Sequence, residues 1–176
     1  MTLLNKQNEY YLSKVRNNKL SKFSSMGKGL IAEQVVANYL CVDNLNIKYN
    51  NFNHSFDLFN DILGRINVKG RKLRKQSNGV YTKYRNWNFR FKYQYITGKN
   101  RVDTYFLIGF DEDRKNILRV WIIPNRNILK ETFCITNTEK GLSEYKKYEI
   151  DAKPFNDILH KISKIGCPYL CDVNGG

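Results

Sequence analysis

The sequence predicts an α/β fold in which α-helices flank a central β-sheet. Three observations indicate it: a broad apolar stripe at helical spacing over residues 26–40, an apolar period of two in several segments between 47 and 123, and helix-boundary residues around 155–164. The chain has 176 residues, enough for one compact domain and short of two comfortable ones. We therefore expect a single domain over residues 1–176.

The N-terminal part carries two helix signals. Residues around 3–22 place leucines and a valine among polar residues, which favours a helix. Ser24 and Ser25 can cap a second helix over residues 26–40. Glu33 lies about 110° from the centre of the apolar stripe of that helix, at 100° per residue. Its carboxylate can therefore emerge beside whatever the helix packs against.

A β-hairpin follows the second helix. Residues 47–59 are rich in aromatic and β-branched side chains, residues 60–64 are typical of a turn, and residues 65–69 form the return strand. If the turn centres on Ile62, antiparallel counting places Asp57 opposite the residue at position 67.

The return strand has two different faces. Ile66 and Val68 face the core, which leaves Arg65, Asn67 and Lys69 on the opposite face. Because Asp57 pairs with this strand, we expect Asp57, Asn67 and Lys69 to converge on one patch.

Later segments complete the sheet. Residues 87–93 alternate, with an aromatic face that we interpret as core. Residues 103–110 and 117–123 form the clearest hairpin of the chain, and the acidic residues between them are interpreted as a solvated loop. A terminal helix is expected over residues 155–164.

The charge indicates a polyanionic partner. Lys and Arg number 30 against 16 Asp and Glu, a net charge of +14 with a pI near 9.6. Twelve of the basic residues and no acidic residue lie between positions 65 and 101, a concentration that favours nucleic acid over mere solubility. The residues expected to contact nucleic acid are Arg65, Arg71, Lys72, Arg74, Lys75, Lys83, Arg85 and Arg90.

Other classes are disfavoured by the sequence. It contains no apolar run near the roughly 20 residues of a membrane span, so no membrane partner is expected. The N-terminus lacks the features of a signal peptide. A cytoplasmic or other intracellular reducing compartment is therefore expected, with Cys41, Cys134, Cys167 and Cys171 as free thiols rather than a zinc site.

Three short motifs resemble those of the PD-(D/E)XK nuclease superfamily. They are residues 29–33 (GLIAE), 56–58 (FDL) and 66–70 (INVKG), and they occur in the order of that family. The resemblance covers roughly residues 25–123 and leaves 124–176 as a C-terminal extension. It implies a restriction-endonuclease-like core with a mixed β-sheet, and it looks most like the homing, restriction or junction-cleaving members.

The resemblance also implies an active site for phosphodiester hydrolysis. It assigns Asp57 as the principal ligand of Mg²⁺, for which Mn²⁺ is a substitute, together with the backbone carbonyl of Val68. Glu33 would hold the metal through water or bind a second ion. Lys69 would position or ionise the attacking water, or stabilise developing charge. The products would carry 5′-phosphate and 3′-hydroxyl ends. Double-stranded DNA is the expected partner, and cutting both strands implies a homodimer or higher even oligomer.

Asn67 departs from the motif, which has Asp or Glu two residues before the lysine. Its amide oxygen can coordinate a hard cation but carries no charge, so metal affinity should fall. Three functions stay open. We favour a site-specific metal-dependent DNA endonuclease; the alternatives are a non-catalytic DNA- or RNA-binding module on the same fold and a ribosome- or RNA-associated basic protein.

Overall fold

The structure is a computed structural model. It describes residues 25–45, 56–75, 84–92, 96–97, 101–128 and 130–164. Several predictions lie outside these residues: the helix around 3–22, most of the strand over 47–59, Lys83, and the two C-terminal cysteines Cys167 and Cys171.

A five-stranded mixed sheet forms the centre of the molecule, with strand order β1-β2-β5-β6-β8. Its strands are β1 (Leu58–Asn60), β2 (Gly64–Lys72), β5 (Thr104–Phe110), β6 (Ile117–Pro124) and β8 (Glu149–Ile150). Strands β2 and β5 are parallel and the other neighbours are antiparallel. The α/β fold with a mixed central sheet is therefore confirmed.

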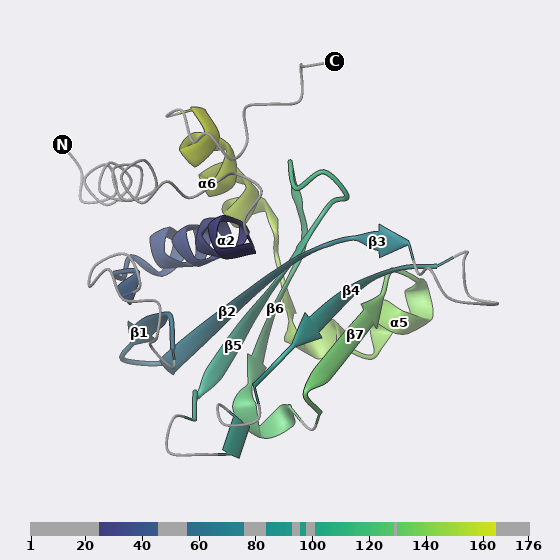
Figure 1. Cartoon of the computed structure of the whole chain (residues 1–176), viewed down its shortest axis with the longest axis horizontal. Coiled ribbons are helices and arrows are strands. Elements are labelled where there is room, and N and C mark those ends of the chain that lie inside the picture. The colour runs from purple at the N-terminus through teal and green to yellow at the C-terminus, as the bar shows by residue number, and fades with distance from the viewer. Residues whose placement is uncertain are drawn as a thin grey trace.

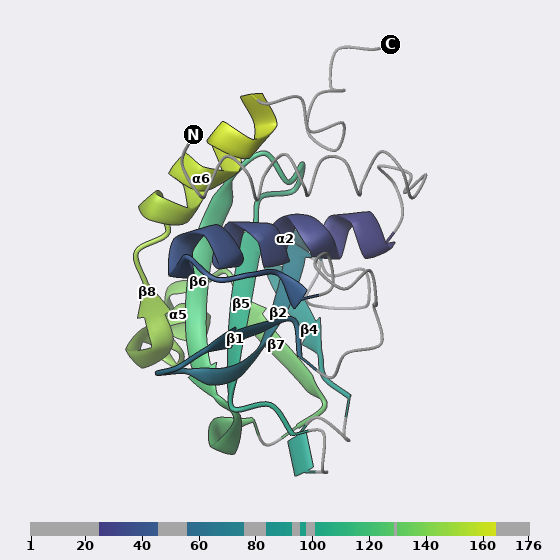
Figure 2. The same ribbon diagram turned by 90° about the vertical axis from the view of Figure 1, so that its left-hand side faces the viewer.

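Different layers cover the two faces of this sheet (Figures 1 and 2). The helices α2 (Ser25–Leu40) and α6 (Lys153–Lys164) pack on one face and on each other. A second, antiparallel sheet covers the other face, in the order β3 (Arg74–Lys75), β4 (Arg85–Arg90) and β7 (Thr132–Thr136). In the described residues the longer helices α2 and α6 thus lie on one face only, while the second sheet covers the other, a difference from the expected arrangement.

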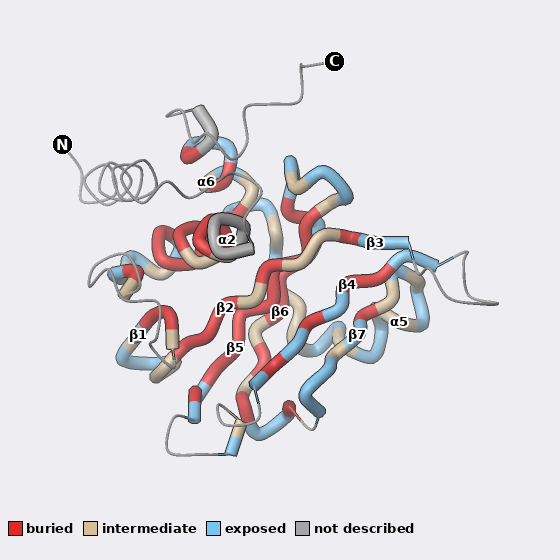
Figure 3. Tube along the Cα trace, viewed as in Figure 1, coloured by how far each residue is buried: buried red, intermediate tan, exposed pale blue. Residues whose placement is uncertain are grey.

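Alternation along β5 builds two cores. Phe106, Ile108 and Phe110 point to the helices, while Tyr105 and Leu107 point to the second sheet. All seven residues of β5 are buried because both faces of the strand are covered (Figure 3). The predicted aromatic core face is confirmed: Trp87 and Phe89 of β4, and Phe91 just after it, are buried in the core between the two sheets.

Gly70 sets the close packing of α2 against β2. A Cβ at this position would lie 2.8 Å from Cβ of Ala32 and 3.0 Å from the ring of Phe110. A larger residue would therefore push the helix from the strand. Because Ala32 precedes Glu33, this contact also fixes where Glu33 leaves the helix.

The helix boundaries follow the sequence closely, whereas the strand predicted over 87–93 is β4 over Arg85–Arg90 and the return strand predicted over 65–69 is the longer β2. The second helix begins at Ser25 instead of residue 26, and the terminal helix begins at Lys153, two residues before the predicted start. The hairpin predicted over 103–110 and 117–123 is present as β5 and β6.

Residues after 124 contribute to both sheets. Strand β7 pairs with β4, β8 pairs with β6, and between them lie η2 (Asn125–Asn127), α5 (Glu139–Ser143) and η3 (Lys146–Tyr148). Within the described residues, no helix is both long and apolar enough to cross a membrane.

Candidate active site

A tight turn joins β1 to β2 and fixes their register. Asn60 Oδ1 accepts hydrogen bonds from the backbone N–H groups of Ile62 and Leu63 at 2.9 and 3.1 Å, as a turn-forming asparagine does. Gly64 has φ +70°, and a Cβ there would lie 2.6 Å from Oδ2 of Asp103. Glycine is therefore required at this turn.

The turn places Asp57 beside β2, where it bonds to Ile66 and Val68. Leu58 pairs with Ile66, and the Asp57 N–H donates to the Ile66 carbonyl at 2.8 Å. The β1–β2 register ends at this pair, and the predicted pairing of Asp57 with Asn67 is not part of it. Asp57 is 8% exposed, and its carboxylate Oδ2 accepts a hydrogen bond from the Val68 N–H at 2.7 Å. The strand backbone therefore orients this carboxylate.

Asn67 is buried, although the sequence places it on the face away from the helices. Its register partner Tyr105 belongs to the core between the two sheets, so the second sheet covers this face. Asn67 is 3% exposed, and its Oδ1 is shielded from solvent without a hydrogen-bond partner. A buried acceptor left in this state carries a desolvation cost unless a ligand or ion satisfies it.

The Val68 backbone points to the same edge as Asp57. Its N–H donates to the Asp57 carboxylate, and the N–H and C=O of one strand residue point to the same side. The Val68 carbonyl therefore points to the edge of β2 where the carboxylate lies. The pairing of β1 with β2 ends at Leu58 and Ile66, one step before this point.

Burial and two nearby acids have opposite effects on the pKa of Lys69. Burial lowers the pKa of its ammonium group from the usual value, the carboxylates of Asp57 and Glu33 oppose that shift, and Arg71 adds to it. Lys69 is thus within electrostatic range of both acids that the sequence assigns to the site.

Glu33 reaches this region from the helical layer. It is half-buried, and its Oε2 accepts a hydrogen bond from Asn44 Nδ2 at 3.4 Å. The structure thus places Asn67 and Lys69 on β2, binds Asp57 to Val68 between them, and brings Lys69 within range of the charges of Asp57 and Glu33.

The donor set near Lys69 is made of oxygen atoms. It comprises two carboxylates, one amide oxygen and one backbone carbonyl, the ligand types that hard cations such as Mg²⁺ and Mn²⁺ prefer. Among the described residues, no three His, Cys, Asp or Glu side chains form a group that could hold a metal ion. A metal here would depend on the uncharged oxygens of Asn67 and Val68.

The predicted nucleic-acid contacts differ in their surroundings. Arg65 pairs with Asp103 at 3.2 Å, and Arg85 pairs with Glu112. These two guanidinium groups are therefore already neutralised in part. Arg71 and Lys72 are half-buried near the end of β2, while the side chains of Arg74, Lys75 and Arg90 are exposed.

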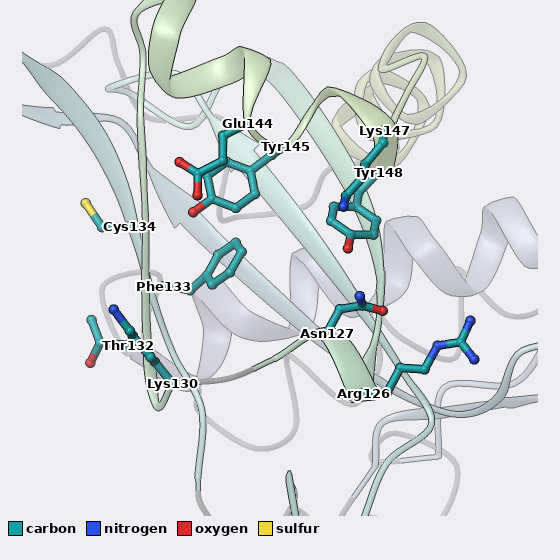
Figure 4. A pocket seen from close by; sticks show the side chains of 10 residues that line it. All are labelled: Arg126, Asn127, Lys130, Thr132, Phe133, Cys134, Glu144, Tyr145, Lys147 and Tyr148. Carbon is teal, nitrogen blue, oxygen red and sulfur yellow. The ribbon is translucent and has the colours of Figure 1, made fainter.

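Two cavities lie elsewhere on the molecule. One of about 630 Å³ is bounded by β7, η2 and η3, and combines Phe133, Tyr145 and Tyr148 with basic side chains (Figure 4). Burial and Glu144 raise the pKa of Tyr145 to about 12, so its hydroxyl stays protonated at neutral pH. Another of about 540 Å³ lies beside the β1–β2 turn and is lined in part by Phe59. Neither is lined by Asp57, Asn67 or Lys69, and an extended polymer requires no closed cavity.

Sequence reasoning missed two residues with a structural role near the site. Asp103 is the first residue of the strand predicted over 103–110, yet its carboxylate also accepts a hydrogen bond from the backbone N–H of Arg65 at 2.8 Å and braces the β1–β2 turn. Arg114 belongs to the loop interpreted as solvated, yet it lies over the ring of Phe110. A carboxylate facing a glycine with positive φ is a contact between distant segments, which the local pattern does not contain.

No family model matches the chain, and no curated protein matches it in sequence.

Proposed function

We propose that this protein is a metal-dependent DNA endonuclease whose active site comprises Glu33, Asp57, Asn67 and Lys69. The observation that carries the proposal is the buried Asn67 Oδ1 without a hydrogen-bond partner. Asn67 precedes Val68, whose N–H binds the Asp57 carboxylate, and lies two residues before Lys69, on which the charges of Asp57 and Glu33 act. Separately, each residue has an ordinary structural explanation. Together they form a site with an unfilled oxygen ligand and a cation beside it.

The residues fit a hard divalent cation. Asp57, the amide oxygen of Asn67 and the carbonyl of Val68 would hold Mg²⁺, with Glu33 as an outer ligand through water. Mg²⁺ is bound by one or two carboxylates together with water and substrate phosphates, so a site poor in acids is compatible with it. The metal would supply neutralisation of negative charge on the phosphate and a more acidic water.

Lys69 would stabilise negative charge on the reacting phosphate. Its ammonium group is partly desolvated, and charge interactions are stronger in such surroundings than in water. Its lowered pKa also makes it a better proton acceptor than an exposed lysine. Asp57 is held by the Val68 N–H, which keeps its carboxylate in one orientation during the reaction.

The second candidate function is a DNA- or RNA-binding module without cleavage. The observation that favours it is Asn67 itself: the amide brings no charge, which weakens any metal site built around it. In that case Lys69 and the neighbouring arginines would bind the phosphate backbone only.

Cleavage of supercoiled plasmid, linear duplex and a four-way junction tests the proposal, in Mg²⁺, in Mn²⁺ and in EDTA. We expect cleavage with either metal and none in EDTA. Asp57→Asn should reduce the cleavage rate by about 100-fold or more, because the metal loses its charged ligand. The new amide can still accept from the Val68 N–H, so the fold and DNA binding in EDTA should persist. Asp61→Asn, in the exposed part of the same hairpin, is the matched control and should cleave normally.

Asn67→Asp separates the two functions. A competent site should cleave at lower metal concentration after this change, because the added carboxylate strengthens cation binding. If the natural protein cuts nothing and Asn67→Asp cuts, the chain is a binding module with a latent site. If neither protein cuts any of the three substrates in either metal, the proposed active site is wrong.

A further inference from the structure

The loop between β5 and β6 lies against the end of β2, beyond the candidate active site. Phe110, the last residue of β5, pairs with Lys72, and its carbonyl accepts from the Leu73 N–H at 3.0 Å. Figure 1 shows this loop beside the point where β2 leads into β3. The hairpin therefore brings residues 111–116 to the basic segment that follows Lys69.

Hydrogen bonds within the loop hold its backbone. The Asp111 carboxylate accepts from the N–H groups of Lys115 and Asn116 at 2.8 and 3.1 Å. Arg114 donates its N–H to the Asp111 carbonyl at 3.3 Å and has φ +61°, a conformation that costs energy for a residue with a Cβ. The Asp111 carboxylate is therefore occupied by bonds within the loop. Arg114 is held at a backbone conformation that is unfavourable for its residue type.

Arg114 turns inward, although it lies in a surface loop. Its guanidinium carbon lies 5.3 Å from the centroid of the Phe110 ring. Its Nε atom is shielded from solvent and has no hydrogen-bond partner. A buried donor of this kind is satisfied when a ligand brings an acceptor.

Arg71 is held in place by backbone carbonyls. Its Nε donates to the Asn88 carbonyl at 3.2 Å and its Nη1 to the Gly70 carbonyl at 3.0 Å. A guanidinium group has five N–H donors in a fixed fork, so donors remain for a ligand. Because both acceptors are uncharged carbonyls, these bonds position the Arg71 side chain without neutralising its positive charge.

Arg71 and Arg74 lie near enough to Arg114 for their charges to act on it, and we call these three residues the arginine cluster. Burial lowers the pKa of Arg114 to about 10, and Arg71 and Arg74 add to that shift. Burial together with Arg74 and Arg90 lowers the pKa of Arg71. In the part of the chain that the structure describes, none of the three cluster arginines forms an ion pair, and Glu112 of the same loop pairs with Arg85 instead.

We propose that Arg71, Arg74 and Arg114 bind the phosphate backbone of a nucleic acid. The partner class rests on the proposed function, whereas the need for an anion rests on the cluster alone. Arginine suits a phosphate because its planar fork can donate two parallel hydrogen bonds to phosphate oxygens. The site follows Lys69 along β2, so a strand bound here would continue toward the candidate active site.

The test measures binding of a labelled DNA duplex to the full chain by fluorescence anisotropy in EDTA, over a series of salt concentrations. Arg114→Met removes the charge and keeps an apolar stem over Phe110. We expect about tenfold weaker binding at moderate salt, and a slope of log affinity against log salt that is smaller by about one. The loss should be similar for unrelated DNA sequences, because a phosphate contact carries no sequence information.

Arg126→Met is the matched control. Arg126 is an exposed arginine of η2, at the opposite end of β5 and β6 from Arg114. An equal loss of affinity in both variants would mean that only net charge matters, and would overturn the proposal. Unchanged binding in Arg114→Met would overturn it as well.

Two further experiments are needed. One distinguishes free phosphate from nucleic acid as the bound anion, and the other distinguishes failure of this site from failure of the proposed active site. Inorganic phosphate is compared with chloride at equal ionic strength by thermal unfolding. Stabilisation by phosphate that Arg114→Met abolishes, without any DNA binding by the natural protein, would make this a free-phosphate site and refute the nucleic-acid partner. Because EDTA prevents the proposed cleavage, Arg114-dependent DNA binding in a protein that never cuts supports this site while the proposed active site fails.

Discussion

At the residue scale, the difference between an acid and an amide at position 67 decides what the site can do. A carboxylate buried there beside Asp57 would place two negative charges in a desolvated place, which is costly without a cation. Asn67 avoids that cost and leaves one unsatisfied oxygen instead. The natural residue therefore makes the metal-free protein more stable and the metal site weaker.

Lys69→Met tests whether the natural lysine lowers the free energy of unfolding while it supports cleavage. Desolvation lowers the pKa of Lys69 despite two nearby acids, so its charged form is less favourable in the folded chain than in the unfolded one. Replacing it by an apolar side chain of similar length should raise the free energy of unfolding at pH 7 by about 1 kcal/mol. Cleavage should be lost. Chemical denaturation checks the stability, with Lys161→Met on the exposed face of α6 as the control.

The pH dependence of this gain follows from the direction of the shift. Between the lowered folded-state pKa and 10.5, the unfolded chain binds the Lys69 proton and the folded chain does not, so natural stability rises with pH. The variant lacks that rise. Its advantage should therefore shrink as pH approaches 10.5, and an advantage that grows instead would contradict this account of Lys69.

At the element scale, the β1–β2 hairpin is the part that aligns the site, and Asp103 braces it from another strand. Its carboxylate accepts from the backbone N–H of Arg65 at 2.8 Å and from the Arg65 Nε at 3.2 Å. These bonds connect the turn to the start of β5. Gly64 leaves room for this carboxylate, so Gly64 and Asp103 together hold the turn against the start of β5.

Asp103→Asn should weaken this connection. The hydrogen bond from the Arg65 N–H, followed by the charge of the Arg65 side chain, lowers the pKa of Asp103 below 3.8. The stabilisation is therefore present above pH 3.8 and is lost as pH falls through the folded-state pKa. At pH 7 the variant should lose about 0.5 kcal/mol, since solvent screens this exposed pair. Urea unfolding at pH 7 and near pH 2 checks it: a difference between variant and natural chain that persists at pH 2 would argue against the carboxylate's charge.

The elements that sequence reasoning predicted correctly are those with strong local signals. The alternation in β5 and β6, the stripe of α2 and the turn at Asn60 are each contained within a few residues. Counting about Ile62 even predicts the pairing of β1 with β2. These elements place Asp57, Asn67 and Lys69, so the candidate site follows from local patterns and one register.

At the scale of the whole molecule, the missing information was which layer covers which face. The second sheet pairs β4 with β7, segments separated by about 40 residues, and nothing local in either strand specifies that pairing. As a result, Asn67 is buried where the sequence suggests an outward polar face. The pairing of Arg71 with the Asn88 carbonyl depends on the same long-range contact.

Each chain carries one candidate site, whereas the two strands of a duplex run in opposite directions. Under the proposed function, cutting both strands requires two copies of the chain related by a two-fold axis. One copy alone should nick a supercoiled plasmid. The natural protein should therefore sediment as a dimer or higher even oligomer on DNA, and its linear product should form without accumulation of nicked circles at high protein concentration.

Mixing natural protein with Asp57→Asn tests this assembly through its products. In an equal mixture of freely exchanging dimers, roughly a quarter carry two active sites and about half carry one. The mixed dimers bind both strands but cut one, so nicked circles should accumulate in proportion to the inactive partner. Gel analysis of plasmid products measures the ratio. If the inactive chain merely dilutes activity, with the proportion of linear to nicked product unchanged, each chain cuts independently of a partner and the dimeric arrangement is wrong.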